Sequence, residues 1–413
     1  MDAMARVDGA APMAPPGQRR MMVFRAFLAQ NVAVGCAFGG FGVSVLPLQQ
    51  TYGASSGTAA LALSICVLVL GLASPLIGSL IGRIGLRWTM IAGVLISAAG
   101  YALLAFAPSM TVVLLLYALP LGVGLAMFGP FPASVLASNW YAHNPGTALG
   151  IANTPLFAAI LPIIGLIVIR DHGLATFYLL LAALHLALLP FLLGVVDGPP
   201  DRQHAPADAH GHVSHGMITV GRLMRSPVFW IMSLGAGYLN AVGITGVSHL
   251  AAVVAERGVA AAQAAGLLSI MGGSAVFGSL VIGILCSKLG APRTLALLAA
   301  ALALSWLLLL SVVAFGPMAA CALVLGAAGA GVFPAVNMLS ARLFGQDSLP
   351  RVIGLFAIVT LPLTFGIPPL VGVMRDATGR YEPVIAAVIG GCAVVAVIFF
   401  LMARAASRAA PAD

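Results

Sequence analysis

Charged residues are scarce in this sequence. They make up 7% of its 413 residues, whereas soluble domains carry about 25%. Mean hydropathy is +1.09, so the chain is not an ordinary soluble protein. It has no Walker A motif, which excludes direct use of ATP. It also has no basic cluster beyond Arg19-Arg20, so the net charge of +8 does not indicate a nucleic-acid partner.

Reactive side chains are also few. The five cysteines lie inside apolar runs without a CxxC spacing, so we interpret them as small core residues rather than as disulfides or catalytic thiols. His204, His210, His212 and His215 lie in one polar stretch, where a weak metal site is an alternative to a solvated linker. The prediction is a protein without enzymatic activity, cofactor or metal.

Long apolar runs are abundant. Twelve runs of about 20 residues each suffice to cross a bilayer. They lie near 26–50, 57–82, 88–107, 110–137, 147–169, 174–196, 228–252, 263–287, 293–315, 317–343, 350–374 and 381–403. The sequence therefore predicts an all-α membrane protein of two six-helix bundles. The predicted parts are a tail (1–25), a first bundle (26–196), a linker (197–227), a second bundle (228–404) and a C-terminal tail (405–413).

The basic residues indicate an orientation. With both termini inside, fifteen of the nineteen fall on the cytoplasmic side, and only Arg170, Arg257, Arg375 and Arg380 fall outside. Such a bias is typical of cytoplasmic segments. We therefore expect a multi-pass protein of the cell inner membrane, monomeric, with both termini cytoplasmic.

The two halves carry the same landmarks. Gly78-x4-Arg83-x-Gly85 returns 205 residues later as Gly283-x4-Lys288-x-Gly290. Phe131-Pro132 is matched by Phe333-Pro334, Pro155-x6-Pro162 by Pro362-x6-Pro369, and Arg170-Asp171 by Arg375-Asp376. A duplicated bundle with a substrate site between the halves is typical of secondary transporters.

The stretch Gly78 to Arg87 resembles the loop between helices 2 and 3 of the major facilitator superfamily, written G-x-x-x-D-R-x-G-R-R. Gly82 and Ser287 stand where the family has its acid. The resemblance implies that Arg83, Arg87 and Lys288 act in gating. The two matched pairs Arg170-Asp171 and Arg375-Asp376 sit at predicted outer helix ends, where salt bridges would bias alternating access. Surface ion pairs of negligible energy are the alternative.

Within that superfamily, the first half is similar to the monocarboxylate porter and oxalate:formate antiporter branch. The similar pieces are Phe41-Gly42-Val43, Tyr52-Gly53-Ala54-Ser55 and Tyr141-x6-Ala148-x-Gly150-x-Ala152. Asn144 and Pro145 replace the basic pair of that last signature. The resemblance implies small organic anions as substrates, moved by proton symport, exchange or facilitated diffusion.

No Asp, Glu, Lys or Arg lies in the middle of a predicted helix. Neutral side chains are therefore the candidates for substrate binding, since their amides and hydroxyls hydrogen-bond a carboxylate or carbonyl without a buried full charge. In the family fold, helices 1, 4, 7 and 10 line the cavity. The predicted substrate-binding residues are Asn31, Tyr238, Asn240, Asn337, Phe41, Phe131 and Thr360. Packing between helices is the alternative for each of them.

His249 is the predicted proton carrier, because its unperturbed pKa suits a pH-driven step; an interfacial histidine is the alternative. The function hypothesis is a transporter of monocarboxylate-like metabolites. Two alternatives stay open. One is an exporter of neutral or amphipathic compounds, which an uncharged, Phe-containing cavity favours; the other is a membrane receptor that does not transport.

Overall fold

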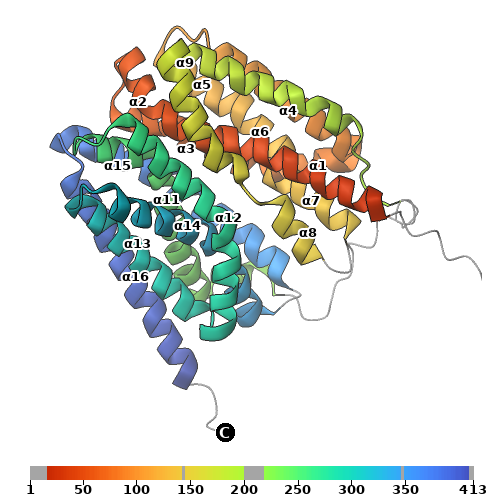
Figure 1. The fold of residues 1–413 in the computed structure, drawn as a ribbon. Coiled ribbons are helices and arrows are strands. Elements are labelled where there is room, and N and C mark those ends of the chain that lie inside the picture. The colour runs from red at the N-terminus through yellow and green to blue at the C-terminus, as the bar shows by residue number, and fades with distance from the viewer. Residues whose placement is uncertain (1–15, 142–144, 200–217, 346–347, 409–413) are drawn as a thin grey trace, which may run out of the picture.

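The computed structural model describes residues 16–141, 145–199, 218–345 and 348–408. The His-containing stretch lies outside this part of the chain. The predicted N- and C-terminal tails fall largely outside it too. In the described part every regular element is helical, and the helices form two bundles lying side by side, one from each half of the sequence (Figure 1).

The first bundle holds six crossings. Crossing 1 is α1 (Pro16–Val34), η1 (Gly35–Gly40) and α2 (Phe41–Tyr52); crossing 2 is α3 (Ser56–Ile84) and crossing 3 is α4 (Leu86–Leu104). Crossing 4 is α5 (Met110–Leu116), η2 (Tyr117–Leu121), α6 (Gly122–Phe128) and α7 (Pro130–Trp140). Crossing 5 is α8 (Pro145–Ala152) with the part of α9 (Leu156–Leu193) before Gly173, and crossing 6 is the rest of α9.

The second bundle is simpler. A short helix, α10 (Val220–Met224), precedes six further crossings. Crossings 7 to 12 are α11 (Pro227–Ala255), α12 (Ala261–Leu289), α13 (Ala291–Ser311), α14 (Phe315–Phe344), α15 (Leu349–Thr378) and α16 (Glu382–Arg408).

Eleven continuous stretches of the described chain are long and apolar enough to cross a membrane. One of them, Ala148–Leu193, has 46 residues, which is about twice the length one crossing needs. Its chain turns at Gly173, whose φ of 84° departs from the helical region and is easily reached only by glycine. This stretch is therefore two crossings, and the predicted total of twelve is confirmed.

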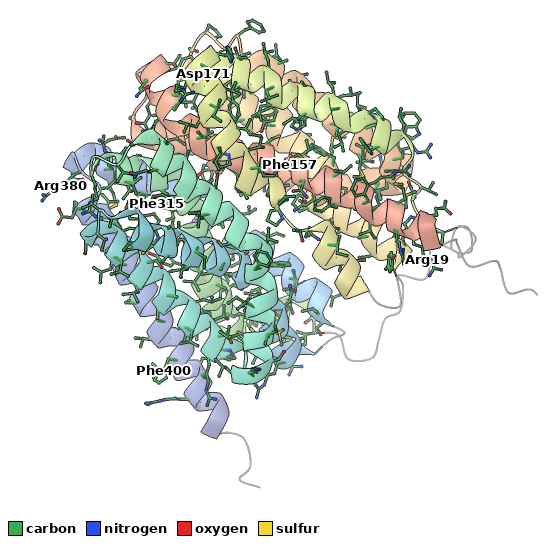
Figure 2. All side chains as sticks on the ribbon, viewed as in Figure 1. Arg19, Phe157, Asp171, Phe315, Arg380 and Phe400 are labelled. Atoms are coloured by element: carbon green, nitrogen blue, oxygen red, sulfur yellow. The ribbon has the colours of Figure 1, made fainter. Side chains whose placement is uncertain are left out.

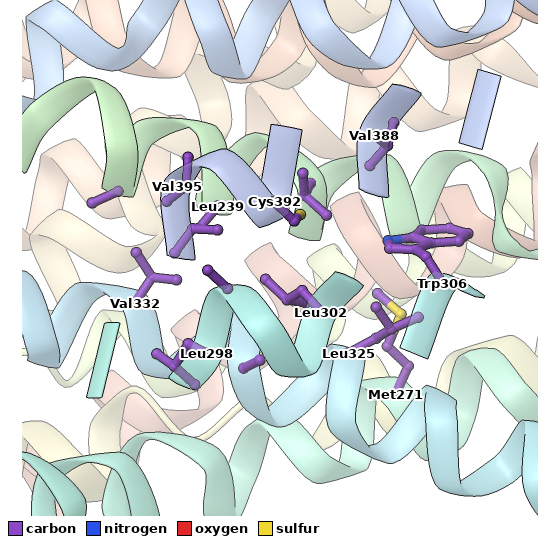
Figure 3. Close-up of a cluster of buried hydrophobic side chains, with 14 of the residues drawn as sticks. Leu239, Met271, Leu298, Leu302, Trp306, Leu325, Val332, Val388, Cys392 and Val395 are labelled. Atoms are coloured by element: carbon purple, nitrogen blue, oxygen red, sulfur yellow. The ribbon is translucent and has the colours of Figure 1, made fainter. Parts of the chain in front are cut away.

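Each bundle has its own hydrophobic core. In the second bundle, Trp306, Met271 and Leu325 pack with Leu302 and Cys392 (Figure 3). All five cysteines are buried and unpaired, as the sequence predicts. Ile244 of α11 is the residue of the second bundle that joins the core cluster of the first, and it marks the face that α11 turns toward the other bundle.

The two hairpins at the duplicated glycine motifs have the same backbone. Gly85 and Gly290 end crossings 2 and 8 at φ of 84° and 82°. Behind each, a threonine hydroxyl (Thr89 or Thr294) donates to that glycine's carbonyl, at 2.8 and 3.0 Å. The internal duplication seen in the sequence is therefore a duplication of local geometry.

Candidate substrate pathway between the two bundles

Broken helices of the first bundle converge where it meets the second. Crossing 1 contains the π-helical turn Gly35–Gly40, crossing 4 is interrupted at Gly129, and crossing 5 is interrupted at Thr154-Pro155. A Cβ on Gly35 would touch Phe157, and one on Gly129 would touch Ala33. Figure 2 shows Phe157 beside crossing 1, between the ends of the molecule. Interrupted helices within a membrane are typical of transporter binding sites.

Asn31 forms hydrogen bonds to both sides of the break in crossing 5. Its amide nitrogen donates to the carbonyl of Thr154, and its amide oxygen accepts from the backbone N–H of Phe157, both at 2.9 Å. The same nitrogen donates to Phe27 within its own helix, also at 2.9 Å. Asn31 is fully buried, and it supplies the partners that the helix loses at Pro155. In this conformation its amide is therefore engaged across two helices.

The break in crossing 4 leaves carbonyls without helical donors. Pro130 and Pro132 have no N–H, so the carbonyls of Ala126 and Phe128, four residues earlier, lack the donor that a regular helix would supply. Crossings 4 and 5 are joined just beyond, where the Asn153 amide donates to the Ser134 hydroxyl at 3.0 Å. The break therefore leaves two carbonyls without their regular helical donors.

The bundles touch through small residues. A Cβ on Gly372 of α15 would stand 2.4 Å from Gly57 of α3, and one on Gly272 of α12 would stand 2.2 Å from Ala158 of α9. Beside the second contact lies a small space of about 40 Å³ bounded by both bundles, including Phe38, Gly42 and Met271. It has room for about one water molecule. The pathway is therefore closed here.

Of the predicted substrate-binding residues, two are exposed. Asn240 lies one helical turn before Ile244, on the face of α11 turned toward the first bundle. Phe131 is 40% exposed beside Gly78. Both positions let a side chain meet a substrate between the bundles.

The other five engage their own bundle. The Tyr238 hydroxyl donates to Val388 at 3.0 Å, the Asn337 amide to Phe333 at 3.1 Å, and Thr360 packs on Gly237. Phe41 is buried edge-on against Tyr117, and Asn31 spans the break described above. The structure does not gather the seven side chains around one cavity.

The predicted gating acid Asp376 links the bundles at one end of the molecule. Its carboxylate oxygens accept from the backbone N–H groups of Ser56 and Gly57, at 3.2 and 3.0 Å, at the start of α3. An acid at a helix N-terminus is favourable because it satisfies free donors and meets the positive end of the helix dipole. Crossing 11 is thereby attached to crossing 2.

Arg375 and His249 lie behind this contact. Arg375 pairs with Glu256 at 2.7 Å and more loosely with Asp376 at 3.6 Å. Glu256 also accepts from the backbone of Tyr381, whose hydroxyl lies 2.9 Å from His249 Nδ1. His249 Nε2 lies 2.8 Å from the carbonyl of Pro368, which can only accept, so the proton sits on Nε2. Buried His249 therefore presents Nδ1 as an acceptor to Tyr381.

The matched pair in the first half behaves differently. Arg170 and Asp171 bind each other at 2.7 Å, with side-chain exposures of 70% and 41%. Figure 2 shows Asp171 and Arg380 toward the end of the molecule opposite Arg19. Among the described residues, Asp171 forms its ion pair with its neighbour Arg170 rather than with the facing bundle. The two predicted outer gates are thus unequal.

At the other end, Arg83 and Lys288 are exposed, and Arg87 donates to the carbonyl of Val195 at 2.6 Å. Asp197, which sequence analysis placed in the linker, accepts from the backbone N–H groups of Leu86 and Arg87 at 2.7 and 3.2 Å. This carboxylate reaches the hairpin that lacks the family's acid at Gly82. Sequence reasoning missed it because it lies 111 residues from its partner.

Comparison with known proteins identifies the family of this chain. The model of the major facilitator superfamily matches residues 27–361, so the chain belongs to that superfamily. No curated protein sequence matches it. Among solved structures, a bacterial homologue of the human lysosomal transporter Spinster, inward-facing and unoccupied, is 15% identical with a TM-score of 0.74, over 95% of this chain and 98% of that one.

A nucleoside transporter, NupG, is 14% identical with a TM-score of 0.75, over 93% of this chain and 99% of that one. At these identities the likeness shows the fold alone. The family resemblance from the hairpin motif and the twelve-helix fold are therefore confirmed, and the family is one of transporters rather than enzymes. The monocarboxylate branch stays a prediction.

Proposed function

We propose that this protein carries a small organic compound with an apolar body and few polar atoms through the space between its bundles. The observation that carries the proposal is the lack of charge along the pathway. In the described part of the chain, every Asp, Glu, Lys and Arg lies toward a helix end or corner; Arg25, for example, donates to Gly194 at the end of crossing 6. A full charge without a partner at membrane depth costs several kcal/mol.

The groups offered to a substrate are neutral. They are the exposed amide of Asn240, the exposed ring of Phe131 and, at the break in crossing 4, the carbonyls of Ala126 and Phe128, which lack their regular helical donors. Such a set binds hydroxyl or amide groups on an apolar scaffold. Monocarboxylates are the second candidate, since the Asn240 amide can donate to a carboxylate without a counter-charge.

The described contacts between bundles lie at the end carrying Asp376 and in the middle of the helices. With the positive-inside orientation, that end is external, and the protein is open to the cytoplasm. Both termini then lie inside the cell, in the inner membrane, and the functional unit is a monomer. The orientation rests on the distribution of basic residues, and the monomeric unit rests on the family resemblance.

Uptake into proteoliposomes tests the proposal. The panel contains an uncharged amphiphile, a lipophilic cation, lactate and oxalate, each with and without an inward proton gradient, with protein-free liposomes as background. We expect saturable uptake of the uncharged amphiphile, reduced at least tenfold in Asn240→Leu and unchanged in His172→Gln, a surface control. Carboxylate uptake that is saturable and lost in Asn240→Leu would instead favour the monocarboxylate candidate.

A receptor would transport none of the panel although it folds. Stimulation by external acid that disappears in His249→Gln would establish the predicted proton coupling. Uptake indifferent to the gradient in both proteins would remove His249 from that role.

A further inference from the structure

A larger cavity lies near the start of α1. Its volume is about 490 Å³, and it is lined by residues of the first bundle alone: Arg20, Val23, Phe24, Phe27, Tyr141, Ala148 and Ile151. They come from the start of α1, the residue after α7, and α8. Figure 1 shows α8 beside α1 and α7, toward the end where α1 begins. The volume is in the range of small-molecule sites, about 300–1,000 Å³.

The lining is amphipathic along α1. Arg20, in the first turns of the helix, is exposed and has no ion-pair partner among the described residues. Phe24 and Phe27 follow, with ring centroids 6.4 Å apart. Seven residues of helix separate Arg20 from Phe27, a rise of about 10 Å. The cavity therefore has one cationic end and an apolar body extending along the helix.

The apolar side chains here are open to the surroundings. Phe24 is 45% exposed and Ile151 is 52% exposed, and Phe24 also meets Phe191 of crossing 6 edge-on at 6.4 Å. In a membrane-spanning bundle, exposed apolar surface that no other helix covers faces lipid tails. A basic residue at the end of such a surface meets the head groups, where anionic lipids attract it.

We propose that this cavity is a binding site for an anionic phospholipid of the surrounding bilayer, with its phosphate at Arg20 and one acyl chain against Phe24, Phe27 and Ile151. Charge complementarity selects the anionic head group, and the apolar lining takes the chain. The proposal does not depend on which substrate the protein carries.

A lipid bound in this cavity would contact α8 and so affect its position. One wall is α8, an eight-residue helix that is separated from α9 by the break at Thr154-Pro155, where Asn31 joins it to crossing 1. An acyl chain bound between α1 and α8 would restrain α8, the part of crossing 5 that the break separates from α9. Occupancy therefore favours the α8 position seen in this structure.

Photocrosslinking tests the site. Purified protein in nanodiscs is exposed to phosphatidylglycerol bearing a diazirine on one acyl chain, or to phosphatidylcholine with the same chain, and labelled peptides are mapped by mass spectrometry. We expect labels on α1 and α8 with phosphatidylglycerol. Labelling there should fall about fivefold with phosphatidylcholine or in Arg20→Gln, the worth of one basic residue at an anionic surface.

Matched variants separate the site from the general lipid shell. Ile151→Trp should fill the cavity and abolish the label, whereas Leu72→Trp, at an exposed residue of crossing 2, should leave it unchanged. Arg83→Gln, at an exposed arginine that does not line the cavity, controls for Arg20→Gln. Labels spread evenly over the bundle, or equal labelling by the two wild-type lipid preparations, would overturn the proposal even where a variant fails to fold.

Discussion

The two bundles share their proline positions but fold differently around them. Pro155 interrupts crossing 5, whereas its counterpart Pro362 lies inside α15, which runs unbroken from Leu349 to Thr378. Likewise Pro132 lies just after the interruption at Gly129, while Pro334 is inside continuous α14. Both π-helical turns also belong to the first bundle. The irregular backbone is thus concentrated in one half.

The difference lies in the partners available to the freed backbone groups. At Pro155, Asn31 supplies a donor and an acceptor from another helix, and Asn153 and Thr154 bond back to Leu149 and Gly150. At Pro362, the nearby threonines bond within their own helix, Thr364 to Thr360 at 3.2 Å. A break within a membrane persists only where other groups replace the lost hydrogen bonds. Duplicated prolines therefore permit a break without dictating it.

This comparison suggests that the first bundle flexes and the second moves as a rigid body. The second bundle contributes the firm contacts, Gly372 on Gly57 and Asp376 on the start of α3. The first contributes the hinged segment α8 and the irregular turns. Four variants test this division of roles.

The largest effect is expected at Gly372. An added Cβ would stand 2.4 Å from Gly57, whereas the same change at Gly366 of the same helix meets nothing within 4 Å. Gly372→Ala should prevent the bundles from closing at this end and lower uptake at least tenfold; Gly366→Ala should not. Equal uptake in the two variants would show that this close contact is not needed for transport.

The next largest effect is expected at the break in crossing 5 that Asn31 bridges. Asn31→Ala leaves the Phe157 N–H without a partner, at about 1–3 kcal/mol for a buried donor. The Thr154 carbonyl loses the Asn31 amide and keeps the Leu156 N–H, at 3.1 Å. We expect a lower melting temperature in detergent. The control in the other half, Tyr238→Phe, removes a single hydrogen bond worth about 1 kcal/mol. If the melting temperature of Asn31→Ala is not below that of Tyr238→Phe, the break in crossing 5 does not depend on the Asn31 hydrogen bonds.

The unequal outer gates predict a smaller effect. Asp376→Asn weakens two hydrogen bonds at the start of α3, a change of about 1 kcal/mol, so the open population at this end should rise severalfold. Asp171→Asn should leave it unchanged, because Asp171 binds only its exposed neighbour among the described residues. Spin labels at His172 and Arg380, read by pulsed electron paramagnetic resonance, report the separation. The same change in label separation in both variants would show that the two outer ion pairs contribute equally to gating.

The smallest effect is expected at the hairpins. Asp197→Ala removes the acceptor for the first N–H groups of α4, a loss of about 1 kcal/mol for a helix cap. The melting temperature should fall slightly while uptake persists. Loss of uptake with an unchanged melting temperature would instead make Asp197 a gating residue. Asp197 would then take the role of the acid that the first hairpin lacks at Gly82.

The sequence by itself determined the number of crossings, the duplication and the superfamily. Runs of apolar residues are local, and a bilayer forces each long run into a helix because its backbone groups have no other partners. The matched glycines also predicted matching hairpins, and Gly85 and Gly290 share their backbone conformation. These features need no knowledge of which helices touch.

Only the tertiary structure decided what each polar side chain does. Asn31 and Asn240 are both amides on apolar helices, yet one spans a break to crossing 5 and the other is exposed on the face turned to the first bundle. Asp376 and Asp171 occupy matched positions, yet only the former meets the start of a facing helix. The partners of Asn31 and Asp376 lie more than a hundred residues away along the chain, so they depend on the packing of crossings rather than on residue type.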